Sequence, residues 1–130
     1  MTTTHPPVAR AFQVSKYFGD SSNPVSALDN VSLDIHSGQF TAIMGPSGSG
    51  KSTLMHVMAG LDNASSGHLM LAGADITSAN DDALTTLRRK QVGFIFQSFN
   101  LVPTLDVRGN ILLPFELDGR APTAQASAWI

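Results

Sequence analysis

The sequence predicts an α/β fold in which a parallel core lies beside an antiparallel layer of strands. Two short, continuous apolar runs, 40–44 and 92–96, are typical of strands buried on both faces of a parallel sheet. A glycine-rich segment separates the first of these runs from an apolar helix, as in many α/β proteins. The antiparallel layer follows from the looser alternation of apolar and polar residues in 8–18 and 27–35.

Each element can be predicted in order along the chain. Residues 1–7 are expected to form a disordered lead-in, and residues 8–130 to form part of one domain. A buried helix is predicted at 51–59 with Met55 and Met58 in the core, then a strand at 67–72. A helix at 80–90 has Asn80 as its cap and acidic and basic residues at opposite ends, where the helix dipole favours them. The segment 107–117 is predicted to be partly helical, and another helix begins near 121, close to Pro122.

Composition excludes several classes of function. The chain has 8 basic and 10 acidic residues, a net charge of -2, which gives no electrostatic footprint for nucleic acid. It has no cysteine, which rules out disulfides, thiolate zinc sites and a cysteine nucleophile. It also lacks an apolar run of membrane-spanning length and an N-terminal secretory signal. We therefore expect the chain to stay in the compartment where it is made.

The strongest motif is the segment 45–52, GPSGSGKS, which matches G-x-x-x-x-G-K-[ST] at every defined position. Glycines allow the backbone to approach a polyphosphate closely, and successive N–H groups then form a concave anion site. The N-terminus of the following helix directs partial positive charge at the same place. The predicted phosphate-binding residues are Gly45, Pro46, Ser47, Gly48, Ser49, Gly50, Lys51, Ser52 and Thr53.

Two of these side chains have distinct predicted roles. Lys51 supplies an ammonium group for the outer phosphates, and the Ser52 hydroxyl is placed to bind Mg²⁺. Gln97 follows the second apolar run, at the strand edge where ligands of open α/β sheets bind. Taken alone, Gln97 is more often an exposed strand-end amide, and Tyr17 and Phe18 are more often ordinary packing residues. Arg88, Arg89 and Lys90 are interpreted as the solvated end of a helix.

Together these residues resemble the ATP-binding subunit of an ABC transporter. The resemblance covers almost the whole chain. It includes 14–19 (VSKYFG), 27–35 followed by Gly38, and the Walker A loop at 45–53. It continues with 60–62 and 66–67, which follow the helix, and with the Q-loop strand 92–97. The continuation 98–105 (SFNLVPTL), with Asn110 and the Leu113-Pro114 pair, is similar to the subfamily that serves lipoprotein release, macrolide or antimicrobial-peptide export, and cell-division-type permeases.

The resemblance implies a P-loop NTPase fold of the RecA-like type, with ATP and Mg²⁺ as cofactors. It implies that Phe18 stacks on adenine, with Tyr17 as the alternative if the alignment slips by one residue. It assigns Gln97 to Mg²⁺ or to the attacking water, as a catalytic residue. It further implies a second ATP-binding subunit and a membrane permease docked on 98–105, which would hold the protein peripherally at the cytoplasmic face of the membrane. Alternatively, the apolar residues of 98–105 pack on the helix at 107–117.

The pattern departs from the family in one large respect. The LSGGQ signature, the Walker B strand and the switch histidine do not follow in these 130 residues, and the single glutamate, Glu116, does not end a buried strand. We therefore expect an N-terminal part of the domain, incomplete at its C-terminus, that does not hydrolyse ATP by itself. The alternative function is a P-loop module that binds nucleotide without hydrolysis. A small-molecule or nucleotide kinase also has a Walker A loop but gives no reason for the other family segments.

Overall fold

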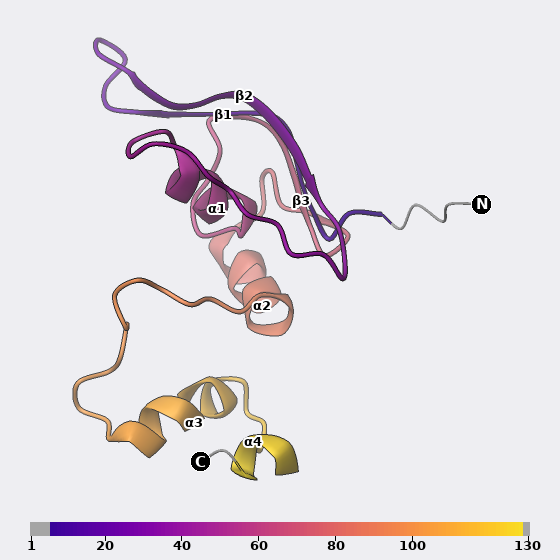
Figure 1. The fold of residues 1–130 in the computed structure, drawn as a ribbon, viewed down its shortest axis with the longest axis vertical. Coiled ribbons are helices and arrows are strands. Elements are labelled where there is room, and N and C mark those ends of the chain that lie inside the picture. The colour runs from indigo at the N-terminus through magenta and orange to yellow at the C-terminus, as the bar shows by residue number, and fades with distance from the viewer. Residues whose placement is uncertain (1–5, 129–130) are drawn as a thin grey trace. The chain divides into compact units, whose positions relative to one another are not determined.

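A four-stranded antiparallel sheet organises the first part of the chain (Figure 1). The structure is a computed structural model that describes residues 6–128, and it divides into two units, Met1–Gln91 and Val92–Ile130. The strand order is β2-β1-β3-β4, and every neighbouring pair is antiparallel. The strands are β1 (Ala9–Phe18), β2 (Val25–Ile35), β3 (Ser66–Leu71) and β4 (Ala74–Asp75). The predicted antiparallel layer is therefore confirmed, with bounds that differ from the prediction by at most two residues.

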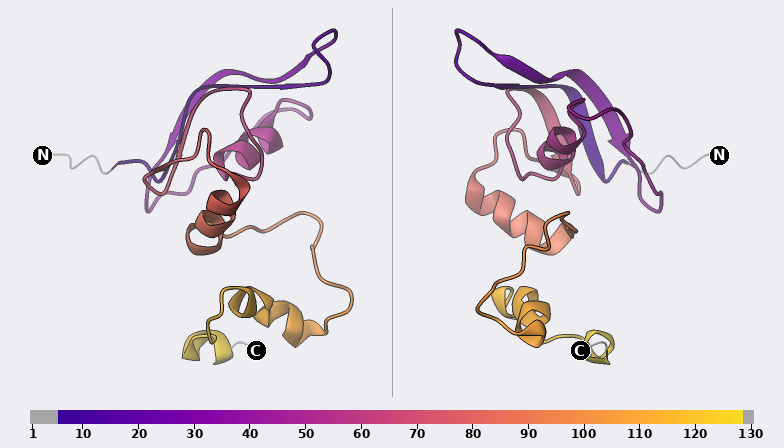
Figure 2. Two further views of the ribbon diagram at one scale, coloured as in Figure 1. Left: turned by 180° about the vertical axis from the view of Figure 1, so that it is seen from behind. Right: turned by 60° about the vertical axis from the view of Figure 1, so that its left-hand side comes forward.

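Helix α1 (Lys51–Met58) packs against this sheet and contacts β1, β2 and β3 (Figure 2). It buries Leu54, Val57 and Met58, which lie at the i, i+3 and i+4 positions of one helix face. Met55 falls outside that face and is exposed, so its predicted place in the core is wrong. The core of the unit lies between this helix face and the side chains of β1 and β3 that point toward it.

Helix α2 (Asp81–Gln91) has the predicted end chemistry. The Asn80 side chain accepts a hydrogen bond from the backbone N–H of Ala83 at 2.9 Å, as an N-cap does. Leu84 is buried beside Gly60. Arg88 is more than a solvated helix end, because its guanidinium donates to the carbonyl oxygen of Gly60 and to the Thr85 hydroxyl. This residue therefore ties α2 to the end of α1.

The two apolar runs do not form strands among the described residues. Phe40 is 98% exposed and Ile95 is fully exposed, and neither 40–44 nor 92–96 is hydrogen-bonded into the sheet. The prediction of buried parallel strands here is wrong for this structure. The physical reason is that a run with no polar face is stable as a strand only where neighbouring strands pair with it and both faces are covered.

The second unit contains two helices, α3 (Val107–Leu117) and α4 (Ala124–Ala128). The predicted partial helix at 107–117 is a complete one despite Pro114, and the Asp106 side chain caps it by accepting from Gly109 N–H at 2.7 Å. The helix expected from about 121 begins at Ala124, and its predicted end at 129–130 lies outside the described residues. Most of the lead-in predicted for 1–7 also lies outside them. No helix in the described part of the chain is both long and apolar enough to cross a membrane.

Candidate functional site

The segment 45–50 forms a loop that leads directly into α1. Its glycines Gly48 and Gly50 have φ values of 77° and 85°, in the left-handed region that other residues rarely adopt. Because α1 begins at Lys51, the N–H groups of its first turn have no partner within the helix and point back toward the loop. The loop and helix therefore have the local geometry that binds a phosphate chain.

Gly50 is required by close packing as well as by its backbone conformation. A Cβ placed at this position would lie 2.3 Å from the carbonyl oxygen of Ala27 and 3.3 Å from Leu28 Cδ2. The backbone of β2 therefore lies directly against the loop where the helix begins. Any side chain at position 50 would push the loop away from the sheet.

Lys51 folds its side chain back over the loop that precedes it. Its ammonium group donates to the carbonyl oxygen of Pro46 at 2.5 Å and to the Ser49 hydroxyl at 3.2 Å. An ammonium group has three donors, so these two contacts leave capacity for a third. The positive charge is thus held over the concave side of the loop, where an anion would lie.

A hollow of about 580 Å³ opens beside the loop and the start of α1. It is lined on one side by the loop and helix, including Ser47, Lys51 and Ser52, and on the other by the start of β2. The β2 residues are Val25, Ser26 and Ala27, which sequence reasoning missed as lining residues. No sequence pattern marks these three residues as lining residues, because only the fold shows that β2 starts beside this loop.

The end of β1 brings Phe18 toward this hollow. Phe18 pairs with Val25 across the sheet, and directly opposite residues of paired strands present their side chains on the same face. Tyr17 and Phe18 follow each other in regular register with β2, so their side chains lie on opposite faces of the strand. The ring of Phe18 lies 5.0 Å from Lys16 Nζ.

Lys16 is held firmly below that ring. Its ammonium group donates to Asp62 Oδ1 at 2.8 Å and to the carbonyl oxygen of Asn63 at 2.6 Å, and its side chain is only 12% exposed. The hydrogen bond from Lys16 holds the pKa of the Asp62 carboxyl below its usual value, against the opposing effect of partial burial. The end of β1 is therefore fixed to the segment that follows α1.

Gln97 lies in the second unit, in an exposed segment without regular secondary structure. It follows Phe94 and Phe96, whose rings stack at a centroid distance of 5.4 Å. Within the first unit the structure brings together 45–53, and it places Phe18 on a strand whose partner lines the same hollow. Gln97 is described only within its own unit.

The apolar loop at 98–105 divides into an exposed part and a packed part. Phe99 is 88% exposed and Leu101 is 64% exposed. Leu105 packs beside Gly109 of α3, where an added Cβ would lie 3.3 Å from Leu105 Cβ. The alternative that these residues pack on the helix at 107–117 therefore holds in part for Leu105, which is still 37% exposed, and not for Phe99 or Leu101.

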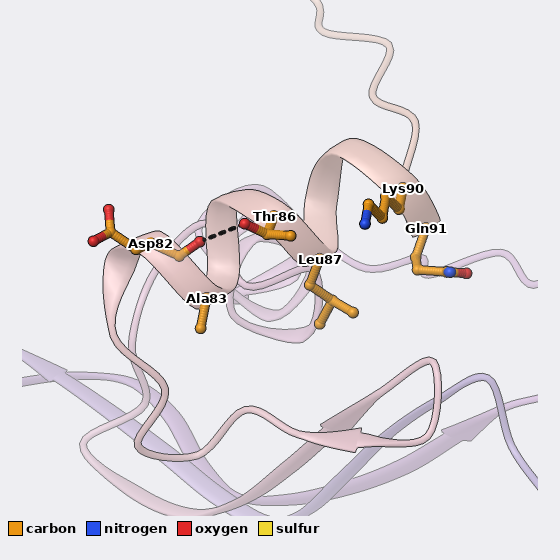
Figure 3. Close-up of a pocket in the computed structure, with 6 residues that line it drawn as sticks. All are labelled: Asp82, Ala83, Thr86, Leu87, Lys90 and Gln91. Carbon is orange, nitrogen blue, oxygen red and sulfur yellow. Dashed lines mark hydrogen bonds between the residues drawn. The ribbon is translucent and has the colours of Figure 1, made fainter. Parts of the chain in front are cut away.

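Another hollow, of about 480 Å³, lies along α2 (Figure 3). It is lined by that helix alone, and Leu87 points into the space between the helix and the strands. No predicted site residue lines it. It lacks the glycine loop and the helix N-terminus that mark the hollow beside α1.

Comparison with known proteins decides the family. The family model described as ABC transporter matches residues 28–130, which is most of the chain. The chain belongs to the ABC transporter family. The resemblance stated from 45–53 and 92–105 is thus confirmed.

The relatives support the same subfamily. The macrolide export ATP-binding/permease protein MacB of Brucella abortus (strain 2308) is 44% identical over 108 residues, which are 83% of this chain and 17% of that protein. MacB of Nitrosomonas europaea is 42% identical over 123 residues, 94% of this chain and 19% of that protein. The chain therefore spans less than a fifth of the length of these curated relatives.

The solved structures confirm the fold class. A dimeric structure of the ATP-binding cassette MJ0796, in a post-hydrolysis state bound to ADP and Pi, matches with a TM-score of 0.82 and 36% identity. The match covers 92% of this chain and 51% of that one. The chain is therefore part of an ABC cassette with the P-loop NTPase fold.

Proposed function

We propose that the protein containing this chain binds Mg-ATP through the 45–53 loop. The observation that carries the proposal is the junction of Gly50 and Lys51, where left-handed glycines, a helix N-terminus and a held ammonium group converge. The helix N-terminus and the backbone N–H groups bind the phosphates, and Lys51 adds the charge for the outer ones. ADP and Pi bound to the cassette MJ0796 support a nucleotide ligand.

The residues present fit a divalent cation bound with the nucleotide. Ser52 lies in the first turn of α1 and lines the hollow, so its hydroxyl oxygen is available as a ligand. We propose Ser52 as a protein ligand of Mg²⁺. The resemblance to the family adds Gln97 as a further ligand and as the residue that orients the attacking water. The cation would neutralise charge on the phosphates, which is its general role in phosphoryl transfer.

We further propose that Phe18 stacks on the adenine ring. Its pairing with Val25, a residue that lines the hollow, supports this proposal, and Tyr17, which pairs with Ser26 of the same lining, stays the alternative. An aromatic ring stacks on any base, so the contact adds affinity with little selection among nucleotides.

In its full-length form the protein hydrolyses ATP to drive a permease. Relatives named ATP-binding/permease protein and a dimeric cassette support a membrane partner and a second ATP-binding subunit. The exposed Phe99 and Leu101 are the proposed contact with the permease, which would hold the domain at the cytoplasmic face of the membrane. For residues 1–130 alone we expect nucleotide binding without turnover.

The test is a comparison of full-length protein with its Lys51→Ala variant. We expect the variant to lose at least about tenfold in ATP affinity, since a charge-assisted contact to phosphate contributes about 1.5–3 kcal/mol. Titration calorimetry measures binding, and phosphate release separates a hydrolysing protein from a binding module. Arg10→Ala, on the far end of β1, is the matched control for loss of a cation. Equal ATP affinity in wild type and Lys51→Ala would contradict the proposal.

A further inference from the structure

Lys16 lies at the crossing of three parts of the first unit: the end of β1, the segment after α1, and the ring of Phe18. Its ammonium group makes two short hydrogen bonds, 2.8 Å to Asp62 Oδ1 and 2.6 Å to the Asn63 carbonyl oxygen. With the side chain only 12% exposed, the charge is withdrawn from solvent rather than directed into it. A lysine that merely kept a surface soluble would not be held in this way.

The ring of Phe18 lies against this fixed charge. The distance of 5.0 Å from Nζ to the ring centroid is within the range of a cation–π interaction. A planar ring has two faces, and the ammonium group occupies one of them. Phe18 is 44% exposed, which leaves room for a base on the other face.

Asp62 and Asn63 connect this arrangement to the phosphate site. They follow α1, the helix whose first turn forms the phosphate-binding end. Lys16 therefore joins the ring of Phe18 to the turn that follows this helix, and the N–H groups of Leu61 and Asp62 donate back to the carbonyl oxygen of His56 in α1. The base contact is thus linked to the helix that presents the phosphate-binding end.

We propose that Lys16 is a positioning residue for the nucleotide base, acting through Phe18 rather than by touching the nucleotide. The inference rests on the proposed stacking of Phe18 on adenine. Without the ammonium group, the ring would be free to rotate away from the hollow, and part of the stacking free energy would be spent on ordering it.

The experiment compares binding of Mg-ATP and of Mg-tripolyphosphate to the full-length protein. Tripolyphosphate occupies the phosphate loop but has no base. We expect Lys16→Met, which keeps the aliphatic stem, to lower ATP affinity about three- to tenfold, a part of a full stacking contribution. Affinity for tripolyphosphate should not change. Lys16→Arg keeps a cation and its donors and should restore most of the loss.

A double-mutant cycle tests whether Lys16 acts through the ring. In a Phe18→Ala background, Lys16→Met should have no further effect on ATP affinity. Asp62→Asn keeps the shape of the partner and should show a smaller loss that is again confined to ATP. Arg10→Met is the matched control, because Arg10 lies on the same strand as Lys16 but away from the hollow. Arg10 makes two hydrogen bonds of 2.7 Å to the carboxylate of Asp34 on β2.

Four results would overturn the inference. Equal losses for ATP and tripolyphosphate would mean that Lys16 acts as a charge on the phosphates. Additive losses in the double variant would mean that it acts independently of the ring. Unchanged ATP affinity in Lys16→Met, with Phe18→Ala weakened, would leave the stacking role standing and remove only Lys16 from it. If Phe18→Ala itself binds ATP normally, the stacking role fails and the inference fails with it.

Discussion

The phosphate loop at 45–50 and the apolar loop at 98–105 are both irregular, but they are held in shape by different means. Glycine φ values and the packing of Gly50 against Ala27 fix the first loop mainly through the backbone, with the Lys51 ammonium group bonded across it. The second has one backbone turn bond, from Leu105 N–H to the carbonyl oxygen of Val102 at 3.1 Å, and otherwise depends on the side chain of Asn110. The amide of Asn110 accepts from Val102 N–H at 2.7 Å and donates to the carbonyl oxygens of Val102, Leu105 and Asp106 at 3.0–3.2 Å.

This difference has a physical consequence for each loop. A loop fixed by its backbone keeps its shape when a surface side chain is removed, but it does not tolerate a Cβ at the wrong position. A loop fixed by one amide tolerates changes along its length, and it loses its shape when that amide is removed. The first arrangement suits a site that must always present the same donors, and the second suits a surface that a partner reshapes.

The largest effect is expected at Gly50. Gly50→Ala must place Cβ 2.3 Å from the Ala27 carbonyl oxygen, so the loop has to move and we expect ATP binding to be lost. Gly48→Ala is the matched control, because Gly48 has a similar φ of 77° but nothing within 4 Å of its Cβ. That variant should lose only the backbone term, about 1–2 kcal/mol. Thermal unfolding and ATP titration of both variants measure the contrast, and similar losses in the two would refute the role of the β2 contact.

The next effect concerns the exposed part of the second loop. We expect Phe99→Asp or Leu101→Asp to abolish co-purification of the permease, because a charge in an apolar interface is costly to desolvate. ATP affinity should stay within a few-fold of wild type. Val107→Asp is the control, since Val107 is also apolar and exposed but lies in α3. Undiminished recovery of the partner with Phe99→Asp would remove this loop from the interface.

Asn110 should give a smaller and more selective loss. Asn110→Ala removes four hydrogen bonds from 102–106, and each net contribution is about 0.5–1.5 kcal/mol in a partly exposed setting. We expect a several-fold weaker permease interaction and faster amide exchange at Val102 and Leu105. Nucleotide binding should not change. Asn110→Asp retains the acceptor for Val102 N–H but loses the donors, and an effect as large as that of alanine would show that the donors dominate.

The phosphate loop could be predicted from the sequence because its chemistry is local. An apolar run, a glycine pattern and a helix are contiguous in 40–59, so the loop and the start of α1 at Lys51 needed no tertiary information. The cap at Asn80 is equally local, because it bonds to Ala83 three residues on. Gln97 was singled out only by its place after an apolar run, and its relation to the loop stays a prediction. The buried strands at 40–44 and 92–96 were wrong for this structure because pairing depends on neighbours that are distant in sequence.

Long-range contacts were beyond the sequence for the same reason. No local pattern places Ala27 against Gly50, which is 23 residues away, or Lys16 against Asp62, which is 46 residues away. Only the contact of Lys16 with Phe18, two residues apart, is local. The four contacts of Asn110 are local, within eight residues. They were missed because an asparagine at the start of a helix has many possible partners.

The smallest expected effect is a pH-dependent one, and it distinguishes the ion pair of Lys16 and Asp62 from the neutral amide of Asn110. Lys16 holds Asp62 by a hydrogen bond that lowers the pKa of the carboxyl, whereas the Asn110 amide does not titrate. Because the folded pKa of Asp62 is depressed, the pair adds stability above the unfolded pKa of about 3.9 and loses it as pH falls through the folded value. As the pH falls below about 3.9 we therefore expect the NMR shifts of the Asp62 and Asn63 amides to move, while the side-chain amide of Asn110 stays constant. In Lys16→Met the Asp62 transition should shift to higher pH. An unchanged transition in that variant would show that the lysine does not set the pKa, and that the segment after α1 is held by its backbone in the manner of the phosphate loop.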